Sequence, residues 1–272
     1  MREKEKNGVV YLKFNNLSPE KAIKHGFTTR IGGCSAPPYD TMNLAYHMGD
    51  DKETVDKNYA YIKTAMDITD HTIKMTTQIH KGNVYSITEE NDTIPEGIDG
   101  LVTDLTGITL TTYFADCVPI LFFDPEKKVI GNAHSGWRGT LEEIGVNVVK
   151  EMIKSYGCDK NNILVGIGPC ISQKNFEVGA EVEHAFTTRY PWSKDFITAG
   201  TGDKWYLDLK GIIKYQLEQI GINSQNIEIS DLCTYENKQL FFSHRRDGNQ
   251  RGNMVAMIGL VSHNECYSKK ST

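Results

Sequence analysis

Hydrophobic residues recur along the chain with two different periods. Apolar residues spaced three to four positions apart predict amphipathic helices over residues 51–66, 140–157, 179–190 and 208–221. Thr140 followed by Glu143 has the pattern of a capping box at the start of the second helix. Short runs rich in Val, Ile, Phe and Tyr predict strands over residues 9–14, 73–80, 83–88, 100–104, 108–116, 162–171, 227–235, 240–248 and 253–261, with two more within residues 115–139.

The order of these segments indicates the fold class. Helices and strands mix without the strict strand–helix alternation of a doubly wound sheet, which favours an α+β fold with mixed or antiparallel sheets. No repeat or Pro/Gly/Ser-rich linker interrupts the chain, so we expect a single domain over residues 1–272. Residues 25–51 form a long Gly- and Pro-rich segment, and a loop of that length in a compact domain is usually functional.

Composition and charge narrow the class of protein. With 39% hydrophobic and 24% charged residues, the chain has the composition of an ordinary soluble globular protein. Its net charge of −5 offers no overall basic field for nucleic acid or a membrane surface. The N-terminal residues contain no apolar signal segment, so we expect a cytoplasmic protein. The six cysteines form no CxxC pair and are expected to be free thiols.

The segment ADCVPILFFDPEKKVIGNAHSGWRG, residues 115–139, has the most unusual pattern. It predicts a hairpin with a type I turn at residues 124–127. This turn places Cys117 directly opposite His134, with Cβ atoms about 4.5–5.5 Å apart, close enough to share a metal ion. A bulge near Pro119 would break this pairing.

His80, at the end of another predicted strand, offers a third ligand. Two histidines, one thiolate and an open position form a catalytic zinc site, and copper can replace zinc at such ligands. The spacing matches no short-range zinc motif, so the residues alone leave alternatives open. Cys117 is equally compatible with a nucleophile that uses His134 as its base and Asp116 or Asn132 as the orienting group, or with a buried thiol.

Nine short motifs occur together and in order, and they resemble those of the YfiH family, labelled multicopper polyphenol oxidoreductase or laccase-like. They are most similar to the YlmD-type members. The motifs are HGFTTRIGG, TTQIHKGNVY, DGLVTD, ADCVPILFFDP, GNAHSGWRGT, GIGPCIS, FEVG, LDL and CTY…FFSHRRDG. The chain departs from the family at Lys81, where many members have Gly. RGNMVAMIGL also replaces the commoner Gly-Arg-x-Ala-Ala pattern near the end.

The resemblance implies a fold and an activity. The fold is a layered α/β sandwich with mixed sheets, similar to the cytotoxic necrotizing factor catalytic domain. One zinc ion is bound by His80, Cys117 and His134. The implied reaction is phosphorolysis of adenosine, inosine and 5′-methylthioadenosine to free base and ribose 1-phosphate, with adenosine deamination as a second activity. The partners are then a purine nucleoside and phosphate, and the protein is a monomer or a homodimer.

This chemistry suggests roles for further residues. Deamination needs an acid/base carboxylate that is not itself a ligand, and Asp116 is the candidate, although regular alternation along a strand would point it away from Cys117. Phosphate is held by arginines and hydroxyls, and Arg30 is the first choice. The expected substrate-binding residues are Arg30, Asn43, Gln78, Arg138 and Arg245.

Other functions remain open. The eight histidines include no His-x-His pair for a trinuclear copper cluster, so we expect any polyphenol oxidase activity to be secondary. An amidohydrolase acting on a cell-wall precursor, through a cysteine nucleophile or zinc, would use the same residues. A protein that only binds zinc would need none of the arginine clusters.

Overall fold

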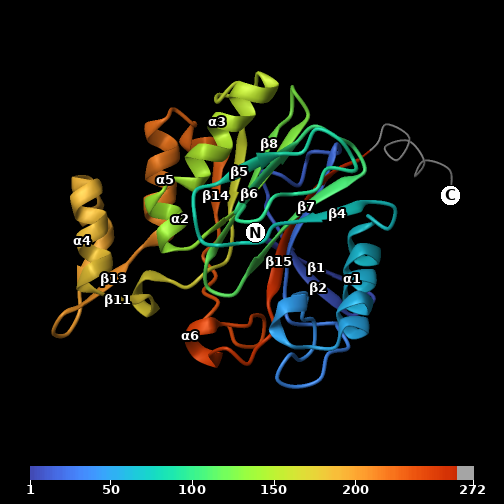
Figure 1. Cartoon of the computed structure of the whole chain (residues 1–272), viewed down its shortest axis with the longest axis horizontal. Coiled ribbons are helices and arrows are strands. Elements are labelled where there is room, and N and C mark those ends of the chain that lie inside the picture. The colour runs from blue at the N-terminus through green and yellow to red at the C-terminus, as the bar shows by residue number, and fades with distance from the viewer. Residues whose placement is uncertain (262–272) are drawn as a thin grey trace.

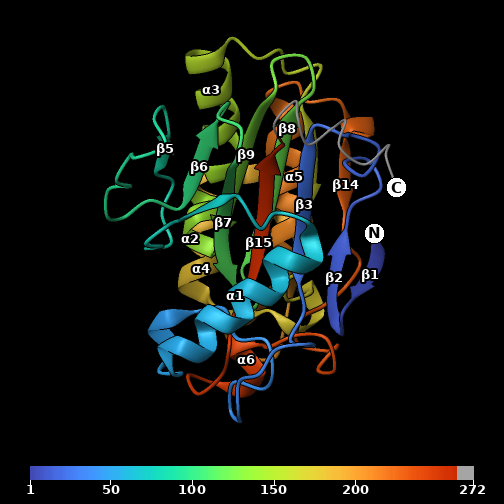
Figure 2. The same ribbon diagram turned by 90° about the vertical axis from the view of Figure 1, so that its right-hand side faces the viewer.

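A six-stranded sheet forms one layer of the protein, in a computed structural model that describes residues 1–261. Its strand order is β1-β2-β3-β15-β7-β4, antiparallel except for the β4–β7 pair. Strand β15, the last along the described chain, therefore lies inside the sheet (Figure 2). The strands are β1 (Arg2–Lys6), β2 (Val9–Lys13), β3 (Ile23–Thr28), β4 (Thr72–Met75), β7 (Ile108–Phe114) and β15 (Met254–Leu260).

A second six-stranded sheet has the order β14-β10-β8-β9-β6-β5, with a parallel pair at each edge. Its strands are β5 (Val84–Ser86), β6 (Gly100–Thr103), β8 (Val118–Asp124), β9 (Val129–Ser135), β10 (Leu164–Ile167) and β14 (Ile227–Ile229). A small antiparallel sheet contains β11 (Glu177–Gly179), β12 (Ile197–Ala199) and β13 (Lys204–Leu207).

Helices cover the outer faces of the two large sheets, so the layers run helix, sheet, sheet, helix (Figure 1). One outer face packs on α3 (Ile144–Tyr156) and α5 (Leu209–Gln219), and the other packs on α1 (Lys52–Met66). The remaining helices are α2 (Trp137–Leu141), α4 (Ala180–Arg189) and α6 (His244–Asp247), with 3₁₀ turns at Tyr46–Met48, Gln173–Asn175, Pro191–Phe196 and Ser224–Asn226. The expected mixed-sheet sandwich is confirmed. No helix within residues 1–261 is long and apolar enough to span a membrane.

Strand β8 shows how the sequence specifies this layering. Every residue of VPILFFD is buried, because the strand has a layer on each side. Ile120 and Phe122 pack with α3 and α5, whereas Leu121 and Phe123 pack between the two sheets. A continuous apolar run is the pattern of a strand covered on both faces.

The predicted register of the β8–β9 hairpin is wrong by two positions. Asp124 pairs with Val129 and Pro119 pairs with His134, so four residues form the loop and Cys117 lies outside the strand. Oδ1 of Asp124 accepts hydrogen bonds from the backbone N–H groups of residues 126 and 127, and Lys128 has a φ of 57°. This local turn lengthens the loop. Because the shift is even, each side chain keeps its expected face.

Two other expectations are corrected. The helix predicted over residues 140–157 is interrupted at Glu143, whose φ is 59° and whose side chain forms no cap. Thr140 belongs to the preceding short helix, where its hydroxyl donates to the carbonyl of Gly136, so there is no capping box. Residues 240–248 do not form a strand; Ser243 caps the short helix α6 there by accepting from the N–H of Arg246. The five described cysteines are free, as expected, and Cys266 lies outside the described residues.

His25 makes the fold sensitive to acid. Its ring is 1% exposed and Nε2 accepts the backbone N–H of Phe14, while burial, with a contribution from Lys13, lowers its pKa to about 3. Below pH ~6.5, His25 is protonated in the unfolded state but stays neutral in the folded state. The contribution of His25 to the free energy of unfolding is therefore fully present above that pH and is lost as the pH falls toward 3.

We expect the free energy of unfolding to drop by about 1.4 kcal/mol between pH 7.5 and 5.5 on account of His25 alone. Urea denaturation at both pH values should show this drop in the wild type and in the control His184→Gln, which changes an exposed histidine. The His25→Gln variant should lose it. Equal pH dependence in all three proteins would contradict the assignment.

Candidate metal centre and cavity

Three side chains that can bind a metal meet at the end of the second sheet. His80 lies in the loop after β4, Cys117 precedes β8 by one residue, and His134 belongs to β9. Their ligand atoms all lie within 4.8 Å of one another. The rings of His80 and His134 meet edge to face, with centroids 4.7 Å apart. The structure thus brings together the three expected residues, and within residues 1–261 it contains this one group of metal-ligating type.

The carboxylate of Asp99, just before β6, holds this group together. Oδ1 accepts from Nδ1 of His134 at 2.8 Å and from the backbone N–H of His80 at 3.0 Å. Oδ2 accepts from the N–H groups of Ile79 and Lys81. Asp99 is fully buried. Burial raises its pKa, but the hydrogen bonds from His134, Lys81 and Ile79 outweigh burial and lower it, so the group is a carboxylate.

This contact leaves Nε2 of His134 available to a metal and fixes the ring that carries it. It also holds His80 in a left-handed backbone conformation, with a φ of 64°. Asp99 was not selected in the sequence analysis, although it opens the DGLVTD motif. The sequence signal that could have identified Asp99 was its place as an acidic residue directly before an apolar strand, with no basic residue beside it.

Cys117 and His134 each stabilise the charged form of the other. Burial raises the pKa of the Cys117 thiol, but the adjacent imidazole of His134, followed by that of His80, lowers it below its ordinary value. Burial lowers the pKa of His134, whereas the Cys117 thiolate and Asp99 raise it. A thiolate is the form that binds a metal and also the form that acts as a nucleophile. These electrostatics therefore suit both alternatives.

Gly136 shows that the three ligands are packed around a fixed space. A Cβ atom at this position would lie 2.9 Å from Cδ2 of His80 and 3.1 Å from Sγ of Cys117. Glycine is thus required for the ligands to approach. Two imidazole nitrogens and one thiolate form a donor set that fits zinc, and copper by substitution.

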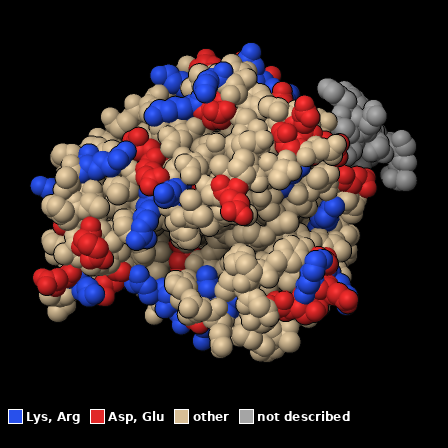
Figure 3. Space-filling model, viewed as in Figure 1, with Lys and Arg blue, Asp and Glu red and all other residues tan. Residues whose placement is uncertain are grey.

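The metal centre opens into a cavity of about 1150 Å³. Tyr46, His47 and Tyr113 line one part of it, with the ring of His47 edge-on to Tyr113. Trp137 and Arg138 from α2 and Arg245 from α6 line another part. Figure 3 shows a hollow between the regions of these two helices, with Lys and Arg side chains gathered around it. An aromatic wall and a basic wall therefore border the same ligand group.

Asp116 reaches the cavity because the chain is not a strand at this point. Its φ is 98°, and β8 begins only at Val118. The carboxylate accepts from the hydroxyls of Thr234 and Ser243 and from the backbone N–H of Arg245. These contacts hold a conformation that non-glycine residues rarely adopt.

Three of the expected substrate-binding residues have other partners. Arg30 does not line the cavity; it forms an ion pair with Asp40 at 3.1 Å and lies over the ring of Phe242. Asn43 is fully buried outside the cavity wall, and its amide is bonded within the loop. Gln78 lines the cavity, but its amide exchanges two hydrogen bonds with the backbone of Tyr113.

The other two expected arginines line the cavity. The guanidinium carbon of Arg138 lies 4.0 Å from the centroid of the Trp137 ring, and Arg138 forms no ion pair with any described residue. The guanidinium of Arg245 donates to the carbonyls of residues 175 and 177 and to no carboxylate of the described residues. A third arginine, Arg251, also lines the cavity and was not selected from the sequence. The signal for it was its place in the basic segment RRDGNQRG.

Replacing Asp99 with Asn should weaken zinc binding by roughly 10- to 100-fold, because an amide cannot accept all four hydrogen bonds and offers a donor instead. Competition with a chromophoric chelator measures the affinity. Asp92→Asn is the matched control, since Asp92 also accepts backbone N–H groups but is only partly buried and lies outside the cavity. Unchanged zinc affinity in Asp99→Asn would refute the role given to this carboxylate.

Gly136→Ala should also weaken zinc binding, by on the order of 10-fold, because the methyl group forces His80 and Cys117 apart. The control is Gly145→Ala in α3, where the nearest atom to an added Cβ is 3.5 Å away. Folding of both variants is checked by circular dichroism. If the two alanine variants bind zinc equally well, the ligands are not confined in this way.

The chain is similar to known proteins over most of its length. Residues 24–261 match the family described as multi-copper polyphenol oxidoreductase laccase. The chain is 34% identical over 249 residues to "Purine nucleoside phosphorylase YlmD" of Bacillus subtilis (strain 168), covering 88% of this chain and 89% of that protein. It is 35% identical over 251 residues to mouse "Purine nucleoside phosphorylase LACC1", covering 90% of this chain and 57% of that longer protein.

Among solved structures, YlmD from Geobacillus stearothermophilus superposes with a TM-score of 0.87 at 30% identity, covering 95% of this chain and 98% of that chain. Sequence and structure agree over nearly the whole length. The chain therefore belongs to the multi-copper polyphenol oxidoreductase laccase family, together with YlmD and LACC1.

Proposed function

We propose that this protein is a zinc-dependent purine nucleoside phosphorylase. Its substrates are adenosine, inosine and 5′-methylthioadenosine, and its products are the free base and the ribose 1-phosphate, or the methylthio derivative of that sugar phosphate. One observation carries the proposal: the His80, Cys117 and His134 group opens into a cavity lined by arginines that have no carboxylate partner among residues 1–261. The names of two relatives support the same activity.

The dimensions and walls of the cavity suit these substrates. A volume of about 1150 Å³ is at the upper end for small-molecule sites and admits a nucleoside together with phosphate. Aromatic rings such as Tyr113 and Trp137 offer faces on which a purine can stack. Unpaired guanidinium groups favour an anion, because their charge is not already neutralised by the protein.

In phosphorolysis a phosphate oxygen forms a bond to C1′ while the bond from C1′ to the purine nitrogen breaks. The electron pair stays with the purine, which takes up the proton that the hydrogenphosphate loses. Zinc at the three ligands would supply Lewis-acid stabilisation of developing negative charge. Arg138 and Arg245 hold the phosphate, and Asp99 keeps the ligand group in place. The cavity walls orient the two reactants, which lowers the entropic part of the barrier.

Adenosine deamination is the second proposed activity. It replaces the 6-amino group with the oxygen of a water molecule and therefore needs a group that carries protons. Asp116 lines the same cavity as the ligands and is our choice for that role. Its three hydrogen-bond donors fix the carboxylate in position.

The test couples metal content to turnover. Purified protein is assayed with adenosine in the presence and absence of phosphate, and adenine, ribose 1-phosphate and inosine are followed by chromatography. We expect about one zinc per chain and phosphate-dependent release of adenine. Cys117→Ala should lose both the metal and the activity, whereas Cys34→Ala, which changes an exposed cysteine, should keep both.

The same experiment separates the rival mechanism. Cys117 next to His134 also has the arrangement of a cysteine nucleophile with its base, as an amidohydrolase would require. Metal-free protein that still turns over and is inactivated by alkylation of Cys117 would make the thiolate a nucleophile and would overturn the zinc proposal. Oxidation of a polyphenol only after copper loading would identify laccase activity as an effect of metal substitution.

A further inference from the structure

Arg251 and Asn253 lie two positions apart, just before strand β15, and both line the cavity. Neither was among the residues selected from the sequence. Through these two side chains, the segment that leads into β15 contributes to the wall of the cavity that Arg138 and Arg245 also line.

Both side chains carry a polar atom that lacks a partner. Nε of Arg251 and Oδ1 of Asn253 are buried and form no hydrogen bond with any described residue. Asn253 is 6% exposed, so its amide oxygen has little access to bulk water. Buried polar groups are nearly always satisfied, and two unsatisfied ones on the wall of one cavity indicate a site that a ligand completes.

The charge around Arg251 favours an anionic ligand. Its guanidinium donates one hydrogen bond, from Nη1 to the carbonyl of Gly248, and it has no carboxylate partner within residues 1–261. The carboxylates on the cavity wall are Glu96 and Asp116, and Asp116 already accepts from three donors. Rotation about the terminal side-chain torsions of Arg251 would allow its Nε and Nη groups to donate hydrogen bonds to a bound oxyanion.

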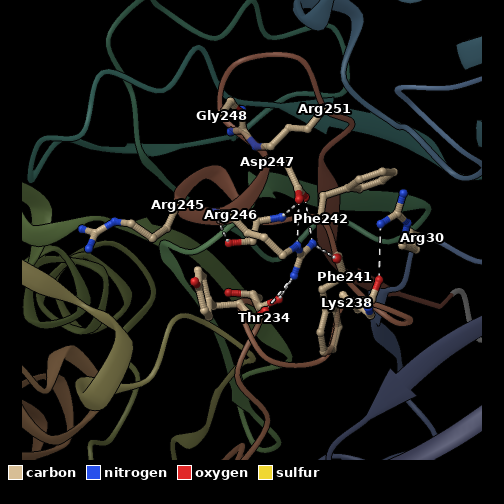
Figure 4. A network of polar contacts seen from close by, with 12 residues as sticks. Arg30, Thr234, Lys238, Phe241, Phe242, Arg245, Arg246, Asp247, Gly248 and Arg251 are labelled. Atoms are coloured by element: carbon tan, nitrogen blue, oxygen red, sulfur yellow. Dashed lines mark hydrogen bonds and ion pairs between the residues drawn. The ribbon is translucent and has the colours of Figure 1, made fainter.

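The neighbouring arginine explains why this loop is fixed. All five N–H donors of Arg246 have acceptors: the carbonyls of residues 234, 235 and 241, and both carboxylate oxygens of Asp247. Figure 4 shows Arg246 at the centre of this network, with Arg245 and Arg251 directed away from it. Arg246 thus holds the loop, while Arg245 and Arg251 remain available to a ligand.

We propose that Arg251 binds the phosphate co-substrate together with Arg138 and Arg245, with Asn253 beside it, whose Oδ1 accepts a hydrogen bond from a P–OH group of the phosphate. This inference rests on the proposed phosphorylase activity.

The test measures the KM for phosphate at saturating adenosine and the KM for adenosine at saturating phosphate. Arg251→Gln should raise the KM for phosphate by roughly 10- to 100-fold, the effect of losing a hydrogen bond to a charged group. The KM for adenosine should change less than about 3-fold. Arg251→Lys should fall between, because lysine keeps the charge but not the two-pronged geometry. Arg189→Gln, which changes an exposed arginine outside the cavity, is the matched control and should match the wild type.

Titration calorimetry with inorganic phosphate alone, on zinc-loaded protein, separates the two proposals. Binding to the wild type and its loss in Arg251→Gln would support the phosphate site even if no nucleoside were cleaved. Phosphate-dependent cleavage with an unchanged KM for phosphate in folded, zinc-loaded Arg251→Gln would overturn the role of Arg251 and leave the phosphorylase proposal standing. Wild-type protein that neither binds phosphate nor requires it for turnover would overturn both.

Discussion

One buried carboxylate determines the geometry of the metal centre. Asp99 accepts hydrogen bonds from the ring of His134 and from three consecutive N–H groups that include His80. His80 and His134 come from chain segments that do not pair as neighbouring strands, so the relative position of these two residues depends on their shared contact with Asp99. A buried charge is costly unless it is fully hydrogen-bonded, and the four donors meet that cost. The same contacts fix the backbone of one ligand and the ring orientation of the other.

The sequence predicted most of the strands, and the structure brings together the three residues expected to bind a metal. The continuous apolar run VPILFFD is typical of a strand covered on both faces, and it forms such a strand, β8, as expected. His80, Cys117 and His134 were identified by their chemistry and by family resemblance, even though the hairpin register used to join two of them was wrong. The error came from side-chain bonding of Asp124 within the turn, which strand periodicity does not report.

Of the residues expected to bind the substrate, Gln78, Arg138 and Arg245 line the cavity, whereas Arg30 and Asn43 do not. Arg30 and Arg245 both lie in basic motifs, yet Arg30 is neutralised by Asp40 whereas Arg245 lines the cavity. Arg245 and Arg246 are adjacent in sequence, but one faces the cavity and the other holds the loop. Whether a guanidinium is structural or free for a ligand depends on partners far away in the sequence. Composition and local spacing carry no information about those partners.

The place of β15 within the first sheet has a consequence for how the protein forms. This strand, the last along the described chain, lies between β3 and β7, so these two strands cannot be bridged until it has been synthesised. The three residues expected to bind a metal all precede Ser135, whereas Arg245 and Arg251 lie in the segment before β15. During translation the residues of this group are therefore synthesised long before the part of the cavity wall that Arg245 and Arg251 supply. Such long-range pairing is slow, so closure of the first sheet and assembly of the cavity are late events that follow chain synthesis.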